Sequence, residues 1–395
     1  MLHRYVRGDF PGLGMFRSYL NTASYGLIPR QARDYTSKFV MEYSDDPLGA
    51  NNLLVTLYER YLGYASSLFN VPKSLVSFTF KTTECISRVL HSISPGRGDE
   101  VLVSSHNFPS SLYLAESYCR RSGCVVKYLP CKTDYRLHNY VSGRTKAVII
   151  DSVNWVTGER IELAPLAEVL EYSGGYLLVD AIQHLGVVPA HDLVKWGDLI
   201  CAGGQKWLLA PTSGMGVMIT SKRLAESLDP LSYSLGNLEG VDWESFWADP
   251  DKGVELGLLS GSARRFAPLT LHSSIGLVLL GEAIKYLSNV GIEAVWSHVV
   301  GLRHMLLEEA ERRGFEVLSP LDEDRSSGIV LLDINREWIN GLRIVKILSS
   351  RGVSVSFRGQ CGVSGMRVSM HLYNSPEDIY SFLDELEYVL GGGYG

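Results

Sequence analysis

Short runs of β-branched and other apolar residues alternate with amphipathic helical stretches between about residues 75 and 220. Seven runs are predicted to be strands: "LVSFTF" (75–80), "EVLVSS" (100–105), "VVKYLP" (125–130), "KAVIID" (146–151), "YLLVD" (176–180), "DLICA" (198–202) and "GVMIT" (216–220). Strands joined by helical crossovers form parallel sheets. The alternation therefore predicts a large α/β domain with a mostly parallel, seven-stranded sheet covered by helices.

The chain beyond residue 262 follows a different pattern. A long helical region over 270–313 precedes three strand-like runs, "GIVLLDI", "VSVSF" and "MRVSM", which are separated by helix-like segments at 341–350 and 376–390. The first 30 residues lack a clean period and are expected to form an arm that packs elsewhere. We therefore expect an N-terminal arm (1–30), a large domain (31–262) and a smaller C-terminal α/β domain (263–395).

The composition excludes two classes of partner. The 395 residues are 46% apolar and 20% charged with a net charge of -6, and both signs are interspersed, so there is no basic stripe to neutralise nucleic-acid phosphates. The longest apolar stretch, "SSIGLVLLGEAIKYL" (273–287), is interrupted by Glu282 and Lys285 and is too short to span a bilayer. We expect neither a nucleic-acid partner nor a membrane segment.

The cysteines give no sign of a metal site. The six are Cys85, Cys119, Cys124, Cys131, Cys201 and Cys361. They contain no CxxC pair and no Cys/His spacing suited to zinc, and no signal peptide precedes them. These features favour reduced thiols in a cytoplasmic protein without a bound metal.

Polar residues gather just after several of the predicted strands. Ligands of open parallel sheets bind at the carboxyl ends of the strands, so these positions are the first candidates for a site. Four groups stand out: Asp180 and Gln183 after "YLLVD", Lys206 after "DLICAGGQ", Lys81 to Glu84 after "FTF", and His106 to Phe108 after "VLVSS".

Each group alone has an ordinary structural explanation. Asp180 and Lys206 could form a simple salt bridge, "KTTECISRVL" could begin with a plain helix cap and Glu84 in its first turn, and Phe108 could be a core aromatic. Together, however, an amine, a carboxylate, a helix N-terminus for a phosphate and an aromatic lid match the needs of pyridoxal phosphate. In that cofactor a lysine forms a Schiff base and a carboxylate keeps the pyridine nitrogen protonated.

The sequence resembles the class V aminotransferase family of fold-type I pyridoxal phosphate enzymes, which contains cysteine desulfurases, isopenicillin N epimerase-like proteins and kynureninases. The resemblance covers nearly the whole chain. It rests on "LNTASYGLIP", "FTFKTTE", "SVNWVTGERIEL", "LLVDAIQHLG", "GGQKWLLAP" and "RVSMHLYNSPEDI" in that order. It implies the two-domain fold-type I architecture and pyridoxal 5'-phosphate as the cofactor.

The resemblance also implies a set of site residues. Lys206 would hold the cofactor aldehyde and act in catalysis with Asp180, which would pair with the pyridine nitrogen. The other implied cofactor-binding residues are Gln183 at the ring hydroxyl, Thr82 and Thr83 at the phosphate, Phe108 over the ring, Gln205 before the lysine, and Thr270.

Two further positions concern the substrate and the assembly. Arg367 in "MRVSMHLYN" sits where the family clamps the substrate carboxylate, a task suited to the guanidinium fork, although a surface arginine on a strand is the ordinary alternative. Thr270 lies in "ARRFAPLTLHSS" (263–274), which resembles the stretch that reaches into the partner subunit's phosphate site. The resemblance therefore implies a homodimer with a shared active site.

Several positions depart from the desulfurase pattern. Desulfurases stack a histidine on the ring where this chain has Phe108, which is closer to kynureninase. Gln205 replaces a histidine, Gly203 a phosphate-binding serine and Trp155 an asparagine, and Leu269 interrupts the usual glycine. Yet "VDAIQHLG" and "GGQKW" also differ from kynureninase, which leaves the subfamily open.

The predicted activity is pyridoxal phosphate-dependent cleavage of a bond at Cα of a small amino acid, with a desulfurase-like or C–S lyase reaction favoured. A kynureninase-like hydrolase, an epimerase, a transaminase and a non-catalytic relative remain alternatives. A cofactor-free or nicotinamide-binding protein on a doubly wound sheet is disfavoured, because no GxGxxG opens a helix after the early strands and because Lys206 would have no role in it.

Cys361 in "SFRGQCGVSGMR" lies where desulfurases carry a sulfur-accepting cysteine. The short loop and the replaced histidines favour an incidental cysteine. We therefore expect a Cys361→Ala variant to keep near-wild-type turnover.

Overall fold

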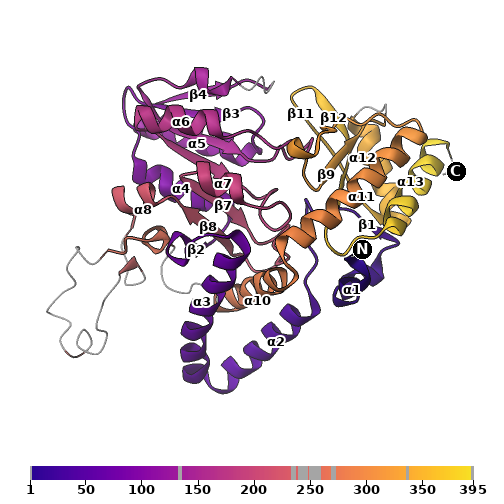
Figure 1. The fold of residues 1–395 in the computed structure, drawn as a ribbon, viewed down its shortest axis with the longest axis horizontal. Coiled ribbons are helices and arrows are strands. Elements are labelled where there is room, and N and C mark those ends of the chain that lie inside the picture. Colours follow the sequence, from indigo (N-terminus) through magenta and orange to yellow (C-terminus); the bar gives the residue numbers. More distant parts are fainter. Residues whose placement is uncertain are drawn as a thin grey trace.

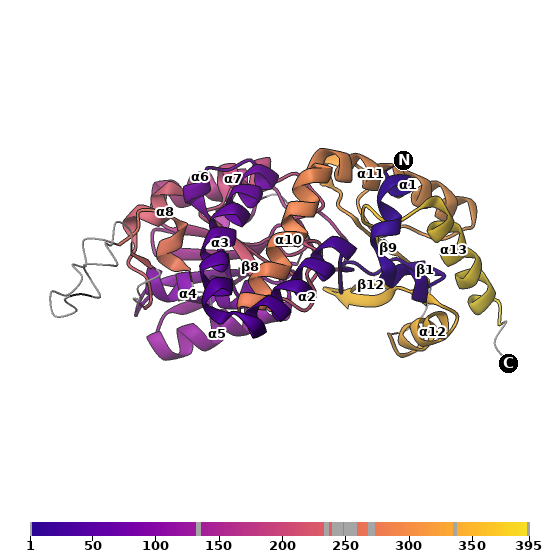
Figure 2. The ribbon, with the colours of Figure 1, turned by 90° about the horizontal axis from the view of Figure 1, so that it is seen from below.

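The protein consists of two units that lie side by side along its long axis (Figures 1 and 2). The computed structural model describes residues 2–131, 136–232, 237–238, 248, 259–267, 273–334 and 338–392. The larger unit is built on a seven-stranded sheet and the smaller one on a three-stranded sheet. Both ends of the chain lie on the smaller unit (Figure 2).

The large sheet confirms the predicted strands, each within one residue at either end. The strands are β2 (Val76–Thr79), β3 (Glu100–Ser104), β4 (Val125–Leu129), β5 (Thr145–Asp151), β6 (Tyr176–Asp180), β7 (Leu199–Gly203) and β8 (Gly216–Thr220). Their order is β2-β8-β7-β6-β5-β3-β4, and β8 is antiparallel to both of its neighbours while the remaining pairs are parallel. The carboxyl ends of β5, β6 and β7 therefore meet at one edge, where a site is expected.

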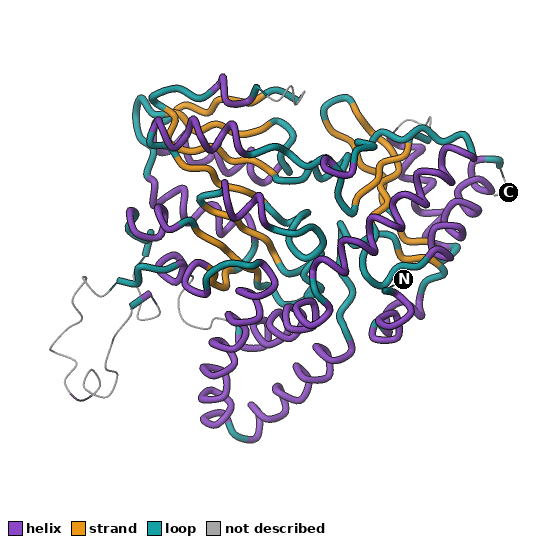
Figure 3. Tube along the Cα trace, in the orientation of Figure 1, coloured by secondary structure: helices purple, strands orange, loops and turns teal. Residues whose placement is uncertain are grey.

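Helices cover both faces of this sheet (Figure 3). Successive residues of β5 alternate between the two sides: Ala147 and Ile149 belong to one buried cluster, Val148 and Ile150 to the other. The first cluster includes residues of α4 (Thr82–Ile93), α5 (Pro109–Ser122) and α8 (Lys222–Ser227). The second includes α3 (Pro47–Phe69), α6 (Ala164–Ser173), α7 (His191–Trp196) and α10 (Ser274–Val290).

The smaller unit is also an α/β layer structure. Its antiparallel sheet has the order β11-β12-β9, from β9 (Ile329–Leu332), β11 (Ser356–Gln360) and β12 (Val363–Ser369). The helices α11 (Ile292–Arg312), α12 (Trp338–Ser350) and α13 (Pro376–Leu390) accompany it. The N-terminal segment joins this unit: α1 (His3–Val6) lies beside it (Figure 2), and β1 (Ser18–Tyr19) pairs in parallel with β10 (Val353–Ser354).

The packing of α10 bears on where one unit ends. Leu277, Leu280 and Ile284 of this helix are buried in the core of the large unit, against α3 and α2 (Arg30–Asp45). Leu302 and Leu306 of α11 belong to the core of the small unit instead. We propose that the units divide between α10 and α11 rather than at residue 262, because α10 completes the large unit's core.

The described part of the chain contains no single helix that is long and apolar enough to cross a membrane. The helices α10 and α11 meet these criteria only as a pair bent by 76°.

The expectation of reduced thiols is wrong. All six cysteines are paired in three disulfides, Cys85–Cys201, Cys119–Cys124 and Cys131–Cys361. Two of these bonds join residues 116 and 230 positions apart, so the spacing of cysteines along the chain gives no hint of them. The cysteines thus offer no argument for a reducing compartment.

Candidate active site

A cavity of about 370 Å³ lies at the carboxyl edge of the large sheet, facing the smaller unit. Three parts of the chain line it: the ends of β6 and β7 with the start of α4, the loops after β3 and β5, and residues from the N-terminal segment and the β11–β12 hairpin. This cavity brings together seven of the predicted site residues: Thr82, Thr83, Phe108, Asp180, Gln205, Lys206 and Arg367.

Asp180 and Lys206 both face this cavity. Asp180 ends β6 and is buried, and its Oδ1 accepts a hydrogen bond of 2.9 Å from the backbone N–H of Ile182. The two side chains, both described, attract each other's charge but form no hydrogen bond or ion pair. The simple salt bridge that the sequence allowed is therefore absent.

Burial shifts the pKa values of both groups. It lowers the pKa of the Lys206 amine to about 8, helped by the positive charge of Arg367 and opposed by Asp180. It raises the pKa of the Asp180 carboxyl to about 6. A lysine with a pKa this low is roughly one-tenth neutral at pH 7, far more than an ordinary lysine, and the neutral amine is the nucleophilic and basic form.

The N-terminus of α4 opens on the same cavity. Its cap residue Lys81 provides no side-chain hydrogen bond, and Glu84 in the first turn bonds Arg88 instead of the helix end. Thr82 and Thr83 line the cavity, and the Thr82 hydroxyl oxygen accepts a 3.0 Å hydrogen bond from Gly203 N–H. Uncapped N–H groups and hydroxyls at a helix N-terminus suit a phosphate.

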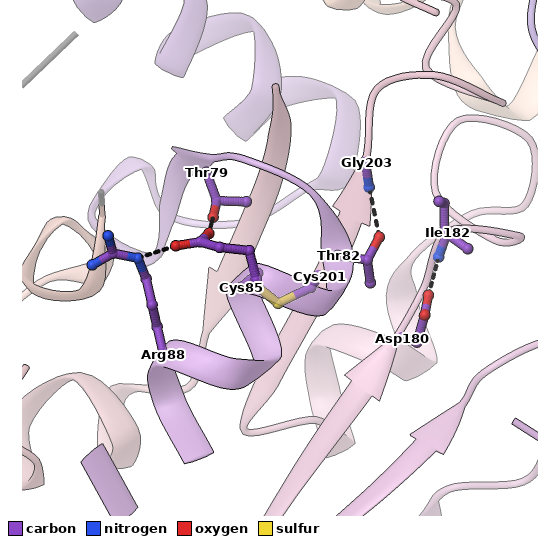
Figure 4. Close-up of a disulfide and its surroundings, with 9 residues drawn as sticks. Thr79, Thr82, Cys85, Arg88, Asp180, Ile182, Cys201 and Gly203 are labelled. Carbon is purple, nitrogen blue, oxygen red and sulfur yellow. Dashed lines mark hydrogen bonds and ion pairs between the residues drawn. A yellow bond between two sulfur atoms is a disulfide. The ribbon is translucent and has the colours of Figure 1, made fainter. Parts of the chain in front are cut away.

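A disulfide anchors this helix end to the sheet (Figure 4). Cys85, in the first turn of α4, is bonded to Cys201 of β7, and both are buried. In Figure 4 the bond lies close to the contact between Thr82 and Gly203. It thus ties the helix end that suits a phosphate to the strand that leads into Lys206.

Phe108 forms a wall of the cavity and is not a core aromatic. Its side chain is 41% exposed, and its ring centroid lies 5.7 Å from Lys206 Nζ. Trp155 meets Phe108 edge-to-face, with ring centroids 5.4 Å apart. Ile182 also lines the cavity, and nothing in the sequence marked this residue as part of a site.

Sequence reasoning also missed Asp151. The parallel pairing of β5 with β6 places Asp151 directly beside Asp180. Its Oδ2 accepts a 2.8 Å hydrogen bond from Phe108 N–H, while Oδ1 is buried and has no hydrogen-bond partner among the described residues. Burial and the neighbouring Asp180 raise the pKa of the Asp151 carboxyl. Its place at the end of "KAVIID" is the signal that could have revealed it, because Asp180 ends its own strand in the same way.

Arg367 lies inside the protein, so it is not a surface arginine. It is 2% exposed, and its guanidinium donates to Ser356 Oγ, Trp155 O and Ser24 Oγ at 3.2, 2.7 and 2.8 Å. Burial and the nearby Arg358, which also lines the cavity, lower the pKa of Arg367 to about 9. All three acceptors are uncharged, so the positive charge remains available to an anionic substrate group.

The N-terminal segment closes the cavity on another side. Ala23, Ser24 and Tyr25 line it, and Gly26 N–H donates to Gln205 O at 2.9 Å. A Cβ on Gly26 would lie 2.0 Å from the Lys206 carbonyl oxygen. The close approach of the two backbones therefore requires glycine at this position.

Two predicted residues are not placed in the cavity. Gln183 does not line it: its Oε1 accepts from Trp207 Nε1 and its Nε2 donates to Ala23 O. This placement gives no support to the expected contact with the ring hydroxyl. Thr270, with the contribution it was expected to make to a partner subunit, lies outside the described residues.

The arrangement fits pyridoxal phosphate. The cofactor presents an aldehyde, a basic ring nitrogen, a flat ring and a phosphate. One cavity offers a buried amine (Lys206), a buried carboxylate (Asp180), an aromatic wall (Phe108) and an uncapped helix N-terminus (α4). The donor set therefore matches each part of the cofactor.

Comparison with known proteins gives the family. The profile of the family "Aminotransferase class-V" matches residues 54–382. A "Probable cysteine desulfurase" of Staphylococcus aureus (strain Mu50 / ATCC 700699) is 23% identical over 410 residues, covering 96% of this chain and 94% of that protein.

Two solved structures share the fold. The cysteine desulfurase CsdA of Escherichia coli has a TM-score of 0.80 at 20% identity, covering 98% of each chain. The cystine C–S lyase C-DES, in complex with cysteine persulfide, has a TM-score of 0.82 at 20% identity, covering 95% of this chain and 98% of that one. The chain thus belongs to the class-V aminotransferase family and is a pyridoxal phosphate-dependent enzyme.

Proposed function

We propose that this enzyme cleaves the C–S bond of a small sulfur-containing amino acid such as cysteine or cystine. The observation that carries the proposal is the buried Lys206 amine, which shares one cavity with Asp180 and Arg367. The relatives support the choice of bond: a curated relative is named a probable cysteine desulfurase, and a structural neighbour is a cystine C–S lyase.

Different residues of the site have different roles in this reaction. Lys206 would hold the cofactor covalently, and once the substrate amine has displaced it, its free amine would take the proton from the substrate Cα. Asp180 keeps the ring nitrogen of the cofactor protonated. The bound cofactor supplies an electron sink for the bonds at Cα. With its uncapped N–H groups and the hydroxyls of Thr82 and Thr83, the N-terminus of α4 holds the phosphate.

Arg367 orients the substrate. Its guanidinium is fixed by Ser356, Trp155 and Ser24, which together restrict it to one geometry. A preorganised guanidinium can bind a carboxylate through two parallel hydrogen bonds. The second arginine of the cavity, Arg358, adds positive charge beside it.

Elimination of sulfide from the substrate is favoured over transfer of sulfur to an enzyme cysteine. Cys361 is bonded to Cys131, and no cysteine is among the described residues that line the cavity. In an elimination, cysteine and water give pyruvate, ammonia and hydrogen sulfide, and no enzyme thiol takes part. A desulfurase would instead give alanine and leave the sulfur on a cysteine.

The test is product analysis with cysteine and with cystine as substrates. We expect pyruvate and ammonia in equal amounts, with sulfide from cysteine and a persulfide from cystine. A Cys361→Ala variant should keep near-wild-type turnover. Cys119→Ala serves as a matched control, because its loss opens a disulfide at the C-terminal end of α5, the end away from Phe108. Alanine as the product, lost in the Cys361 variant only, would contradict elimination. Inactivity towards both substrates would contradict C–S cleavage itself.

A further inference from the structure

Three potential metal-binding side chains meet beside the loop that carries Phe108. His106 follows β3, Cys131 follows β4, and Cys361 lies at the tip of the β11–β12 hairpin. The two sulfur atoms and a ring nitrogen of His106 all lie within 4.8 Å of one another. The first two residues belong to the large unit and the third to the small unit, so the cluster bridges the two.

The hairpin tip is attached to a wall of the cavity by more than the Cys131–Cys361 bond. Gln360 Nε2 donates to Ser105 O at 2.8 Å and to Asn107 O at 2.9 Å. Its Oε1 accepts a 2.5 Å hydrogen bond from Trp155 Nε1. Ser105 and Asn107 belong to the loop that carries Phe108, so the cluster lies immediately behind the aromatic wall.

The backbone conformation at Cys361 is unfavourable for cysteine, so the formation of the turn does not explain why this residue is a cysteine. Residues 361 and 362 form a two-residue turn between the paired Gln360 and Val363, and Cys361 has φ 55° and Gly362 φ 80°. Turns with positive φ at both positions strongly prefer asparagine, aspartate or glycine. Cysteine is a costly choice here, and such outliers gather at functional positions.

His106 completes a ligand set. Its Nδ1 is buried, and no hydrogen bond from the described part of the chain reaches it. Two thiolates and one imidazole suit a thiophilic divalent cation such as Zn²⁺, which takes four ligands from sulfur and nitrogen and can leave one position to water. Spacing along the sequence does not reveal this set, because its two cysteines are 230 residues apart.

We propose that Cys131, Cys361 and His106 form a redox-dependent clamp between the β11–β12 hairpin and the loops after β3 and β4, which is a disulfide when oxidised and a site for one Zn²⁺ ion when reduced. Reduction by a dithiol transfers two electrons and two protons to the disulfide, giving two thiols and an oxidised dithiol. Zn²⁺ then displaces the two thiol protons and binds both thiolates and the imidazole. Either form holds the hairpin that carries Arg358 against the loop that carries Phe108.

The test uses the holoenzyme with Co²⁺ as a spectroscopic substitute for Zn²⁺. The protein is reduced with dithiothreitol, freed of it without air, and titrated with Co²⁺. We expect one equivalent to bind per chain, with the intense red-region absorption of four-coordinate cobalt, away from the yellow cofactor. The oxidised protein should show no such absorption. Mass spectrometry of metal content after Zn²⁺ loading gives the same stoichiometry independently of the cofactor.

Three variants locate the site. Cys131→Ser and Cys361→Ser should lose the cobalt absorption, and His106→Ala should bind more weakly with an altered spectrum. The double variant Cys119→Ser/Cys124→Ser should retain it, because it removes a disulfide elsewhere. Absence of stoichiometric binding in the reduced wild type would overturn the proposal, as would an unchanged spectrum in Cys361→Ser or its loss in the control. None of these readouts depends on which reaction the enzyme catalyses.

Discussion

The two walls of the active-site cavity are built in different ways. On the large-unit side, Asp180, Thr82 and Lys206 follow or end strands of one sheet, and the pairing of β6 with β7 brings the end of β6 beside the strand that leads to Lys206. On the other side, Arg367 comes from the small sheet and is held by Ser24 of the N-terminal segment. The first wall carries the groups that we propose bind the cofactor, and the second carries those that suit a substrate carboxylate.

This difference separates two kinds of effect. A change on the sheet side should alter cofactor attachment and the chemical step, because the proposed function assigns those groups to the cofactor. A change on the hairpin side should alter substrate binding, since that wall depends on contacts between the two units. The four predictions below test this division in order of decreasing effect.

The largest effect is expected for Lys206→Ala on the sheet side. The variant should lose the borohydride-reducible linkage to the cofactor and at least about 10⁴-fold in activity, the upper range for loss of a general base. Peptide mapping after reduction of the wild type measures which lysine carries the cofactor. Attachment to a different lysine would remove Lys206 from its role.

Asp180→Asn should keep the cofactor but slow the chemical step. A neutral amide cannot hold the ring nitrogen protonated, which weakens the electron sink. The loss should be about 2–4 kcal/mol in the transition state, or roughly 30- to 1,000-fold in kcat. Visible absorption checks cofactor content and steady-state kinetics measures kcat. A variant as fast as the wild type would show that the carboxylate is not needed.

On the hairpin side, Arg367→Lys should act mainly on KM. A lysine ammonium cannot reproduce the planar fork, so the substrate should lose about 1.5–3 kcal/mol of binding, or roughly 10- to 100-fold in KM. Arg358→Lys is the matched control in the same cavity and should have the smaller effect. An unchanged KM together with a large fall in Tm would mean that Arg367 only stabilises the fold.

The smallest expected effect is a shift in the pKa of Lys206, which depends on charged residues of both walls. The amine reacts when neutral, so in cofactor-free protein the rate of linkage to added pyridoxal phosphate should rise with pH through a midpoint of about 8. Arg367 lowers this pKa and Asp180 raises it. Arg367→Gln should therefore move the midpoint up and Asp180→Asn should move it down, each by at most about one pH unit. Shifts in the same direction would mean that the charges do not act on Lys206 as the geometry implies.

Local signals made much of the large unit predictable. The seven strands are recognisable because each is a short apolar run with its turn residues nearby, and those signals need no information from distant parts of the chain. Asp180, Lys206 and Thr82 were found in the same way, because each follows or ends such a strand. A parallel sheet gathers these positions at one edge, so their meeting in one cavity follows from the fold class.

Contacts between segments that are far apart in the chain could not be predicted from the sequence. The amide of Gln183 is turned to Trp207 and Ala23, and α10 is buried in the large unit rather than in the small one. Neither feature produces a periodic pattern in the sequence, because each depends on which surfaces meet after the strands and helices have formed.

The sequence by itself therefore determined the strands, the fold class and the residues at the strand ends, because period and position are properties of neighbouring residues. Only the tertiary structure decided that Asp151 lies beside Asp180, that Arg367 is buried against Ser24, and that Cys131 meets Cys361. These pairs come from separate segments, and the cost of closing the chain between them is recovered only when the whole core packs.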